Sequence, residues 1–427
     1  DYRHFPPGLR AITPAPNFRG IFTAVNLEYA IFPHASIAAS MFELITNANI
    51  FAPAPLGLRH LLVCAGKIAY IGHQLPQLDD VLDVVVTDLD GARLVPGLID
   101  AHTHLTGGGG EAGASTRVPP LALSQITSAG VTSVVGLLGT DDLTRSTQNL
   151  LSQVMGLREE GLSAWCYTGG YHLPATTLTG SVRSDIVNLE PVIGVGETAI
   201  SDHRSSQPTV DEILRLASEA HVAGLMTGKA GIVHFHLGDG RRGLEIIRNC
   251  LQLSEIPARV FNPTHVNRNK ALFEEACELS HSGCNVDLTA FPQDADDSGW
   301  SAEDAVQRYL DKNCDATRLT ISSDGGGCLP HFNEQGELLK MGFASCAAMA
   351  DTLKSLLDRG LPEQTVLPLL SSNVANLLKL KHKGQIQSGY DADLVVLDQS
   401  NRIVSVMARG VWQIKNNKQL VSGLFEP

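Results

Sequence analysis

The sequence lacks several features that would each point to a particular class of protein. Its 427 residues contain no run of 18 or more apolar residues, so we expect no transmembrane helix. Lys and Arg number 32 against 45 Asp and Glu, which gives a formal net charge of −13, and no basic run is present. Binding to nucleic acid or to an anionic membrane relies on clustered positive charge. We therefore expect neither partner.

Cysteine pairing is also missing. Eight cysteines are scattered singly and none forms a Cys-x-x-Cys pair, so neither a cysteine zinc site nor a compact disulfide framework is indicated. Free thiols are typical of a reducing compartment, and we expect a cytoplasmic protein. In residues 1–40 the apolar stretch is broken by Glu28 and His34, which makes a poor signal peptide. We expect this segment to be an N-terminal extension outside the fold.

The two ends of the remaining chain differ from its middle. Residues 41–94 and 386–427 show short alternating β segments separated by turn residues. In residues 95–385, apolar runs alternate with helical stretches at a spacing of roughly 26–40 residues. We predict an α/β protein: a (β/α)8 catalytic barrel over 95–385, and a small β-sandwich domain built from both ends. The eight runs begin near Leu94, Val131, Ala164, Val192, Ile232, Val260, Val286 and Leu319.

An open doubly wound sheet is the alternative to a barrel. Such a sheet would normally carry a phosphate-binding glycine loop after an early strand. Residues 107–110 are four glycines, but they lack the spacing of a nucleotide-binding loop and no lysine follows. A flexible turn that lets the backbone approach a substrate is the better interpretation.

Histidines and an aspartate recur at the predicted strand ends. His102 and His104 lie two residues apart, so both side chains point to one side of the first strand. A lone His-x-His is a weak signal for a metal. Here, however, further residues of the types that zinc prefers follow on three other strands: His234, His236, His265 and Asp324. The combined pattern predicts a metal centre at the carboxyl end of the barrel.

This pattern resembles the amidohydrolase superfamily. More narrowly, the strings LIDAHTHLTGGGGEAG, GVTSVVGLLGTD, AISDHRS, FHLGD, PTHVNRN and SSDGGG resemble the β-aspartyl (isoaspartyl) dipeptidases. The resemblance runs from about Met41 to the C-terminus. It implies a metal-dependent dipeptidase that cleaves the isopeptide bond of β-aspartyl dipeptides with a metal-activated hydroxide.

The resemblance also implies a site with two zinc ions per subunit, although manganese or iron would tolerate the same ligands. His102 and His104 would bind the more buried ion, and His236 and His265 the more exposed one. Asp324 would bind the buried ion and act as general base and acid. His234 precedes the family's ligand position, so we expect it to pack behind the ligands.

One departure from the family is chemically important. Most such enzymes bridge the two metals with a carboxylated lysine on the fourth strand, but no lysine lies between Lys67 and Lys229. The family spacing places Glu197 at this position, and we expect its shorter carboxylate to form the bridge. Gly194 and Gly196 would let the backbone come closer. The alternative is a single-metal site in which Glu197 is an ordinary buried carboxylate.

The remaining site residues come from the resemblance as well. Tyr171 would stabilise the oxyanion, unless it is a packed aromatic at the rim. The substrate carries one ammonium and two carboxylates, which Glu111 and the arginines Arg204 and Arg268 would bind. The other substrate contacts would come from Thr140, from the amide of Gly109 and from Cys328, where the family usually has serine.

Two other functions fit parts of the sequence. The same barrel and metals could serve an amidohydrolase that acts on a cyclic amide or an N-acyl amino acid. Such a substrate would not need the ammonium partner Glu111. A catalytically dead barrel used as a scaffold would have lost ligands, whereas every ligand position here holds a competent residue. Family members form homo-oligomers of up to eight subunits, so we expect a homo-oligomer.

Overall fold

The computed structural model describes residues 41–79, 81–290, 298–332 and 337–426. The extension predicted for residues 1–40 lies outside these ranges. Across the described ranges, no helix combines the length and the apolar character needed to cross a membrane.

Eight parallel strands form the barrel, in agreement with the predicted fold. The first six are hydrogen-bonded in sequence order, and the last two pair with each other. The sixth strand packs beside the seventh, and a bridge between Thr103 and Gly325 joins the eighth to the first. The strands are β6 (Leu98–Thr103), β7 (Val131–Gly136), β8 (Ser163–Thr168), β9 (Val192–Ile200), β10 (Val233–Leu237), β11 (Phe261–Thr264), β12 (Val286–Thr289) and β13 (Leu319–Ser322).

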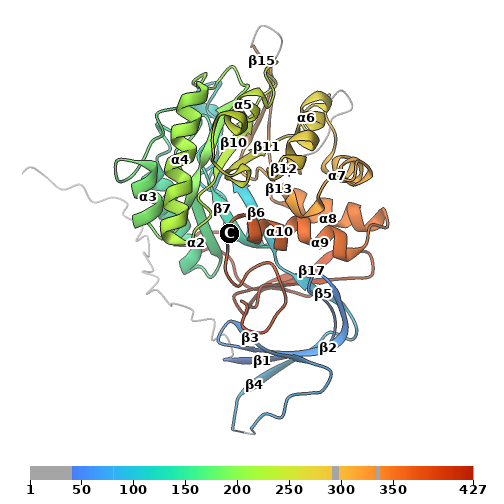
Figure 1. Cartoon of the computed structure of the whole chain (residues 1–427). Coiled ribbons are helices and arrows are strands. Elements are labelled where there is room, and N and C mark those ends of the chain that lie inside the picture. Colours follow the sequence, from blue (N-terminus) through green and yellow to red (C-terminus); the bar gives the residue numbers. More distant parts are fainter. Residues whose placement is uncertain (1–40, 80, 291–297, 333–336, 427) are drawn as a thin grey trace, which may run out of the picture. The chain divides into compact units, whose positions relative to one another are not determined.

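Helices and short 3-10 turns connect these strands and surround them (Figure 1). The α-helices are α1 (Leu123–Thr127), α2 (Thr147–Glu159), α3 (Val182–Asn188), α4 (Val210–Thr227), α5 (Glu245–Leu253), α6 (Lys270–His281), α7 (Ala302–Asp311), α8 (Ala347–Asp358), α9 (Glu363–Leu370) and α10 (Ser372–Leu377). The 3-10 turns are Ala114–Thr116, Ala258–Val260 and Ala316–Arg318. A hairpin of β14 (Cys328–Phe332) and β15 (Leu338–Phe343) follows β13.

Helix α4 illustrates how the sequence defines these connections. Thr209 and Glu212 form a reciprocal capping box at its start, and Gly228 ends it in the left-handed conformation at φ 72°. One face buries Ile213 and Ala217 together with further small residues at helical spacing. The strands that α4 connects are buried on both faces, so they read as continuous apolar runs rather than alternating ones.

Strands from both ends of the described chain share one nine-stranded sheet, drawn in blue and red in Figure 1. Its strands enclose an apolar core of their own that includes Ile45, Leu61 and Trp412. Trp412 also donates through Nε1 to the buried carboxylate of Glu43. The strands are β1 (Phe42–Phe51), β2 (Pro55–Cys64), β3 (Lys67–Gly72), β4 (Val84–Asp88), β5 (Arg93–Pro96), β16 (Leu394–Leu397), β17 (Ile403–Ala408), β18 (Val411–Lys415) and β19 (Lys418–Gln419).

The apolar run near Leu94 is divided between the two sheets. β5 pairs with β1 and β16 in the nine-stranded sheet, and the first barrel strand begins only at Leu98. Gly97 lies between the two strands. A larger residue would not fit at this position, because a Cβ there would lie 2.2 Å from Thr132 Oγ1. Two strands of different sheets are therefore adjacent in the sequence. The pattern of apolar residues does not distinguish them, so it predicted a single strand.

A buried lysine connects the barrel with this sheet. Lys383 Nζ lies 2.5 Å from Asp393 Oδ2, 2.8 Å from Asp391 Oδ2 and 2.6 Å from Ser163 Oγ on β8. Its side chain is only 4% exposed. Removing the lysine would leave the Asp393 carboxylate, which is 6% exposed, buried without its counter-charge.

We therefore expect Lys383→Ala to lower the free energy of unfolding by about 3–5 kcal/mol. Lys67→Ala is the matched control, because Lys67 also contacts Asp391, at 2.5 Å, but is 48% exposed. The control should cost at most about 1 kcal/mol. Urea unfolding followed by circular dichroism compares the two, and equal losses would contradict a structural role for the buried lysine.

Candidate metal centre and active site

The carboxyl ends of five barrel strands bring the six candidate metal ligands together. His102 is the penultimate residue of β6, His104 follows that strand directly, and Glu197 lies in β9. The other three lie in β10 or directly after β11 and β13: His236, His265 and Asp324. All six residues are buried, none being more than 7% exposed.

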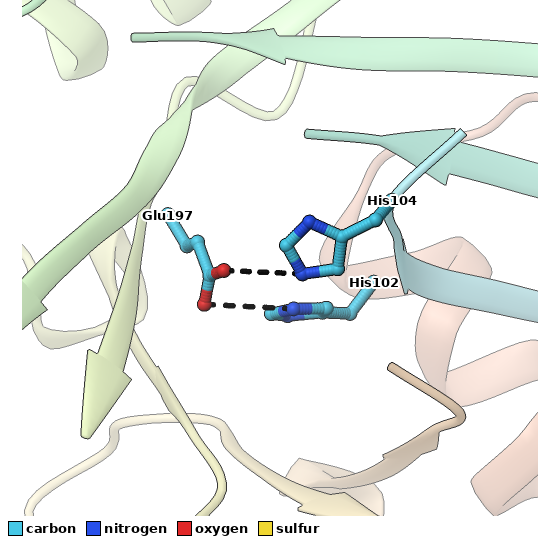
Figure 2. Close-up of side chains that lie close together, drawn as sticks. All are labelled: His102, His104 and Glu197. Atoms are coloured by element: carbon cyan, nitrogen blue, oxygen red, sulfur yellow. Dashed lines mark ion pairs between the residues drawn. The ribbon is translucent and has the colours of Figure 1, made fainter. Parts of the chain in front are cut away.

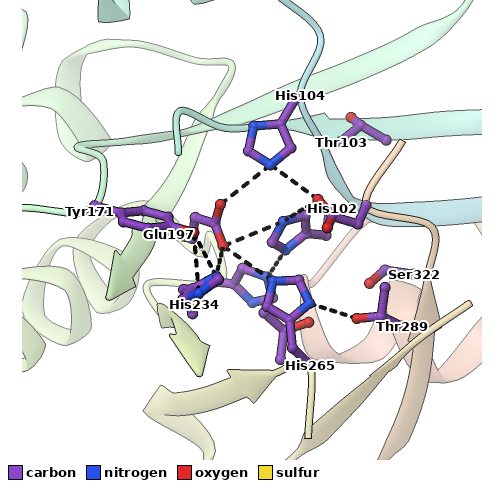
Figure 3. Close-up of polar contacts among 12 residues, drawn as sticks. His102, Thr103, His104, Tyr171, Glu197, His234, His265, Thr289 and Ser322 are labelled. Carbon is purple, nitrogen blue, oxygen red and sulfur yellow. Dashed lines mark hydrogen bonds and ion pairs between the residues drawn. The ribbon is translucent and has the colours of Figure 1, made fainter. Parts of the chain in front are cut away.

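Glu197 lies at the centre of this cluster (Figures 2 and 3). Its Oε1 lies 3.3 Å from His104 Nε2, and its Oε2 lies 3.5 Å from His102 Nε2. The same Oε2 lies 3.1 Å from His236 Nδ1 and 3.4 Å from His265 Nε2. One carboxylate therefore faces imidazoles from three strand ends.

Asp324 completes the cluster. Its Oδ1 lies 3.1 Å from His104 Nε2 and 3.3 Å from His102 Nε2. Three overlapping triads have ligand atoms within 4.8 Å of one another, and Glu197 belongs to two of them. The triads are His102–His104–Glu197, His102–His265–Asp324 and Glu197–His236–His265.

The donor set fits a divalent metal. His102 Nε2 and Asp324 Oδ1 are buried, and neither meets the geometry of a hydrogen bond within the described ranges. Imidazole nitrogens and carboxylate oxygens are the ligands that zinc and similar ions take. Burial raises the pKa of Glu197, but the charges of His102 and His236 outweigh it and hold that pKa well below its usual range. Burial lowers the pKa of His104, but the neighbouring carboxylates of Asp324 and Glu197 outweigh this effect and raise the pKa to about 10. The cluster therefore attracts positive charge.

Glycines bring β9 close to its neighbour at this point. A Cβ on Gly194 would lie 2.8 Å from the Ile232 carbonyl oxygen, and one on Gly196 would lie 2.7 Å from that of His234. Pairing of β9 with β10 shifts register between Val195 and Thr198. The backbone on both sides of Glu197 thus packs directly against β10.

His234 lies behind the cluster and sets the tautomer of a candidate ligand. Asn262 donates through Nδ2 to the Asn285 carbonyl at 3.3 Å, so its Oδ1 accepts from His234 Nδ1 at 2.7 Å. Burial beside His102 lowers the pKa of His234 to about 3, which keeps the ring neutral. His234 Nε2 can then accept from His102 Nδ1 at 2.8 Å. When His102 is in the neutral form that binds metal, its lone pair is therefore on Nε2, facing Glu197 and Asp324.

Other supporting residues were not identified from the sequence. His265 Nδ1 lies 2.7 Å from Thr289 Oγ1, as Figure 3 shows. Asp202 Oδ2 lies 3.0 Å from His236 Nε2 and accepts from Arg204 Nη2 at 2.8 Å. Asp202 stands two residues before Arg204 in the SDHR segment. This proximity to a predicted substrate-binding residue was the only feature of the sequence that pointed to Asp202.

Several of the predicted substrate-binding residues meet beside the metal cluster. Arg204 Nη1 lies 3.3 Å from Glu111 Oε1, which also accepts from Thr140 Oγ1 at 3.1 Å. The Arg204 guanidinium lies over the Tyr171 ring, 5.5 Å from its centroid. Tyr171 Oη in turn lies 2.9 Å from His236 Nδ1. Opposite charges are thus presented next to candidate metal ligands.

The glycine loop carries Glu111 and is held by a buried arginine. Arg145 donates to the carbonyl oxygens of Thr106, Gly108 and Val118, the last two at 2.9 Å. Gly109 has φ 80°, and a Cβ there would lie 2.4 Å from the Thr116 carbonyl oxygen. The loop is therefore tightly packed rather than the flexible turn that the four glycines suggested.

Two of the residues predicted to bind substrate, Arg268 and Cys328, lie outside the network formed by Glu111, Thr140 and Arg204. Arg268 donates through Nη1 to the Leu237 carbonyl at 2.6 Å and through Nε to Asp239 at 3.1 Å. Neither of these hydrogen bonds is made to Glu111 or Arg204. Cys328 lies beside Gly109, and burial raises the pKa of its thiol to about 12. The thiol is therefore neutral.

Comparison with known proteins agrees with this geometry. Residues 93–413 match the amidohydrolase family, so the chain belongs to this family of metal-dependent hydrolases. A dihydroorotase from Lactiplantibacillus plantarum is 23% identical over 401 residues, covering 84% of this chain and 89% of that protein. A dihydropyrimidinase from Brevibacillus agri shares the fold at 16% identity and a TM-score of 0.63, covering 90% of this chain and 97% of that chain.

A more similar structure narrows the family. The β-aspartyl dipeptidase from Fervidobacterium islandicum AW-1, solved in complex with β-Asp-Leu, is 42% identical with a TM-score of 0.85. The match covers 89% of this chain and 98% of that chain. Within the amidohydrolases the chain is thus placed among the β-aspartyl dipeptidases, as the sequence motifs predicted.

The glycine contacts of β9 lead to a test of the site geometry. Gly196→Ala would place a Cβ 2.7 Å from the His234 carbonyl oxygen, so β9 and β10 must separate and carry Glu197 away from His236. We expect metal affinity to fall by about 10-fold or more, measured by competition with a chelator.

Gly156→Ala provides the control, because a Cβ there meets nothing within 4 Å in helix α2. It should leave metal binding unchanged and stabilise the helix by up to about 1 kcal/mol. Wild-type metal affinity in Gly196→Ala would show that the ligands do not depend on close packing of β9 against β10.

Proposed function

We propose that the chain hydrolyses the isopeptide bond of β-aspartyl dipeptides with two divalent metal ions, which we expect to be zinc. The Glu111–Arg204 pair beside a cluster of six potential metal ligands carries the proposal. The 42% identity to an enzyme solved with β-Asp-Leu supports the same substrate class. A cyclic amide would have no ammonium group for Glu111 to bind.

Glu197 would bridge the two ions in place of a carboxylated lysine. Its Oε1 faces His104, and its Oε2 faces His236 and His265 as well as His102, so the carboxylate lies between the two groups of imidazoles. His102, His104 and Asp324 would hold one ion, and His236 and His265 the other. The close packing of Gly194 and Gly196 against β10 supports this arrangement, because the shorter side chain requires a closer backbone.

The charges of the substrate match those of the site. Glu111 Oε2 is buried and makes no hydrogen bond within the described ranges, so it can accept from the substrate ammonium. Arg204 would bind one carboxylate as a bidentate partner. Within the described ranges Arg268 uses Nε and Nη1 for Asp239 and Leu237, and its Nη2 would bind the second carboxylate. Thr140, the Gly109 amide and Cys328 would complete the pocket.

Proton transfer would be carried out by Asp324. Burial raises the pKa of Asp324, but its contacts with His102 and His104 outweigh this effect and lower the pKa, so the group is ionised at neutral pH and can accept a proton from water. It would then deliver that proton to the departing amine. The metal ions, when bound, lower the pKa of the attacking water and polarise the amide carbonyl. Burial raises the pKa of Tyr171 well above 10, so its phenol stays protonated and can donate to the developing oxyanion.

The proposal also includes a cytoplasmic homo-oligomer of up to eight subunits. Light scattering of the purified protein would measure the number of subunits.

The substrate is tested by comparing hydrolysis of β-Asp-Leu and α-Asp-Leu, with metal quantified on the same sample. We expect cleavage of the β isomer alone and about two metal ions per chain. The α isomer has the same composition and charges, so it controls for unspecific peptidase activity. Cleavage of neither isomer by the metal-loaded protein would contradict the proposed substrate.

The role of Asp324 is tested by Asp324→Asn. Asparagine keeps an oxygen ligand but cannot accept a proton, so kcat should fall by about 10²–10⁴-fold while most of the metal stays bound. Steady-state kinetics and metal analysis measure the two effects. Asp311→Asn, on the exposed end of α7, should behave as wild type. Full turnover by Asp324→Asn would remove Asp324 from proton transfer.

A further inference from the structure

Asp202 lies between the predicted substrate arginine and a predicted metal ligand. The residue lies two positions after the end of β9, and its side chain is 4% exposed. Both of its oxygens accept hydrogen bonds from Arg204, and Oδ2 also lies within hydrogen-bond distance of His236. Nothing in the reaction described above uses this carboxylate.

On one side, Asp202 fixes the orientation of Arg204. Oδ1 accepts from Arg204 Nε at 3.0 Å and from the Arg204 backbone amide at 2.8 Å. Oδ2 accepts from Nη2 at 2.8 Å. This two-pronged contact holds one edge of the guanidinium, so that Nη1 faces Glu111 at 3.3 Å. The direction in which Arg204 can bind a carboxylate is thereby set.

On the other side, Asp202 selects the tautomer of His236. Oδ2 lies 3.0 Å from His236 Nε2, and an ionised carboxylate only accepts hydrogen bonds. The proton of the neutral ring is therefore on Nε2, and the lone pair is on Nδ1. Nδ1 is the nitrogen that faces Glu197 Oε2 at 3.1 Å. Arg204 Nη2 and His236 Nε2 lie 3.4 Å apart because both donate to the same oxygen.

We propose that Asp202 is a positioning residue that couples the substrate clamp Arg204 to the metal ligand His236 through its shared Oδ2 atom. The inference rests on the proposed function, in which Arg204 binds a substrate carboxylate and His236 binds metal. A group that holds the second nitrogen of a ligand histidine sets its orientation and basicity. Here that group also holds the arginine, so neither contact can change without the other.

Asp202→Asn tests the coupling, because the amide has nearly the same shape but only one accepting oxygen. If its NH2 group takes the Oδ2 position, it faces Arg204 Nη2 and favours the wrong tautomer of His236. If it takes the Oδ1 position, it faces Arg204 Nε and the backbone amide. We expect affinity for the weaker-bound Zn²⁺ to fall by about 10–100-fold. We also expect the KM for β-Asp-Leu to rise by about 10-fold or more.

Zinc affinity is measured on metal-free protein with a competing chelator and no substrate, and Co²⁺ absorption reports changes in ligand geometry. Asp304→Asn is the matched control, because Asp304 also pairs with an arginine, Arg359 at 2.8 Å, but on exposed helices. It should leave zinc affinity and KM unchanged. The zinc measurement does not depend on the substrate, so failure to cleave β-Asp-Leu by the wild-type protein would refute the proposed function separately.

Two outcomes would overturn the coupling. Unchanged zinc affinity in Asp202→Asn would show that His236 does not depend on Asp202. Weakened zinc binding with an unchanged KM would show that Asp202 serves His236 alone.

A second variant covers the case in which Asp202→Asn does not fold. Arg204→Gln removes the other partner of the shared oxygen, and we expect it to alter zinc affinity several-fold although Arg204 is no ligand. Zinc affinity equal to wild type in Arg204→Gln would overturn the coupling. Where both single variants fold, the double variant should show non-additive effects on zinc affinity.

Discussion

The site is organised around a buried carboxylate surrounded by imidazoles. Glu197 and Asp324 place two negative groups where water is almost excluded, with four histidines as their nearest polar neighbours. Burying such charge is unfavourable unless positive charge accompanies it. Protons on the histidines can supply that charge, and so can metal ions. The carboxyl end of the barrel is thus arranged to bind cations, and the predicted chemistry depends on this arrangement.

The surrounding structure keeps the ligands oriented. Three of the four histidines have their second nitrogen next to a separate polar residue: His234 for His102, Thr289 for His265 and Asp202 for His236. These supporting residues come from β10, from β12 and from the segment after β9. Each of these three candidate ligands is therefore oriented by a neighbouring part of the barrel, which is how metal-ligating histidines are commonly supported.

Much of the fold could be predicted from the sequence, because buried parallel strands are continuous apolar runs and seven of the eight begin close to the expected residues. The run near Leu94 was the exception, since β5 and β6 adjoin in sequence but enter different sheets. Strand-end motifs indicated the candidate ligands. Supporting contacts such as Asn262 with His234 join residues far apart in the chain, and no local pattern encodes them. The same holds for Arg268, which is bound to the Leu237 carbonyl, and for the loop of four glycines, whose carbonyls are bound by Arg145. The amino-acid composition does not show these contacts.

The shared nine-stranded sheet has a consequence for the order of folding. Its first five strands are complete at Pro96, but β16 starts only at Leu394, about 300 residues later. At about 5–20 residues per second, a ribosome needs roughly 15–60 seconds to make that stretch. During this time the edge of β5 has no partner strand, while all eight barrel strands are synthesised. The sheet that begins the described chain is therefore among the last parts to be completed.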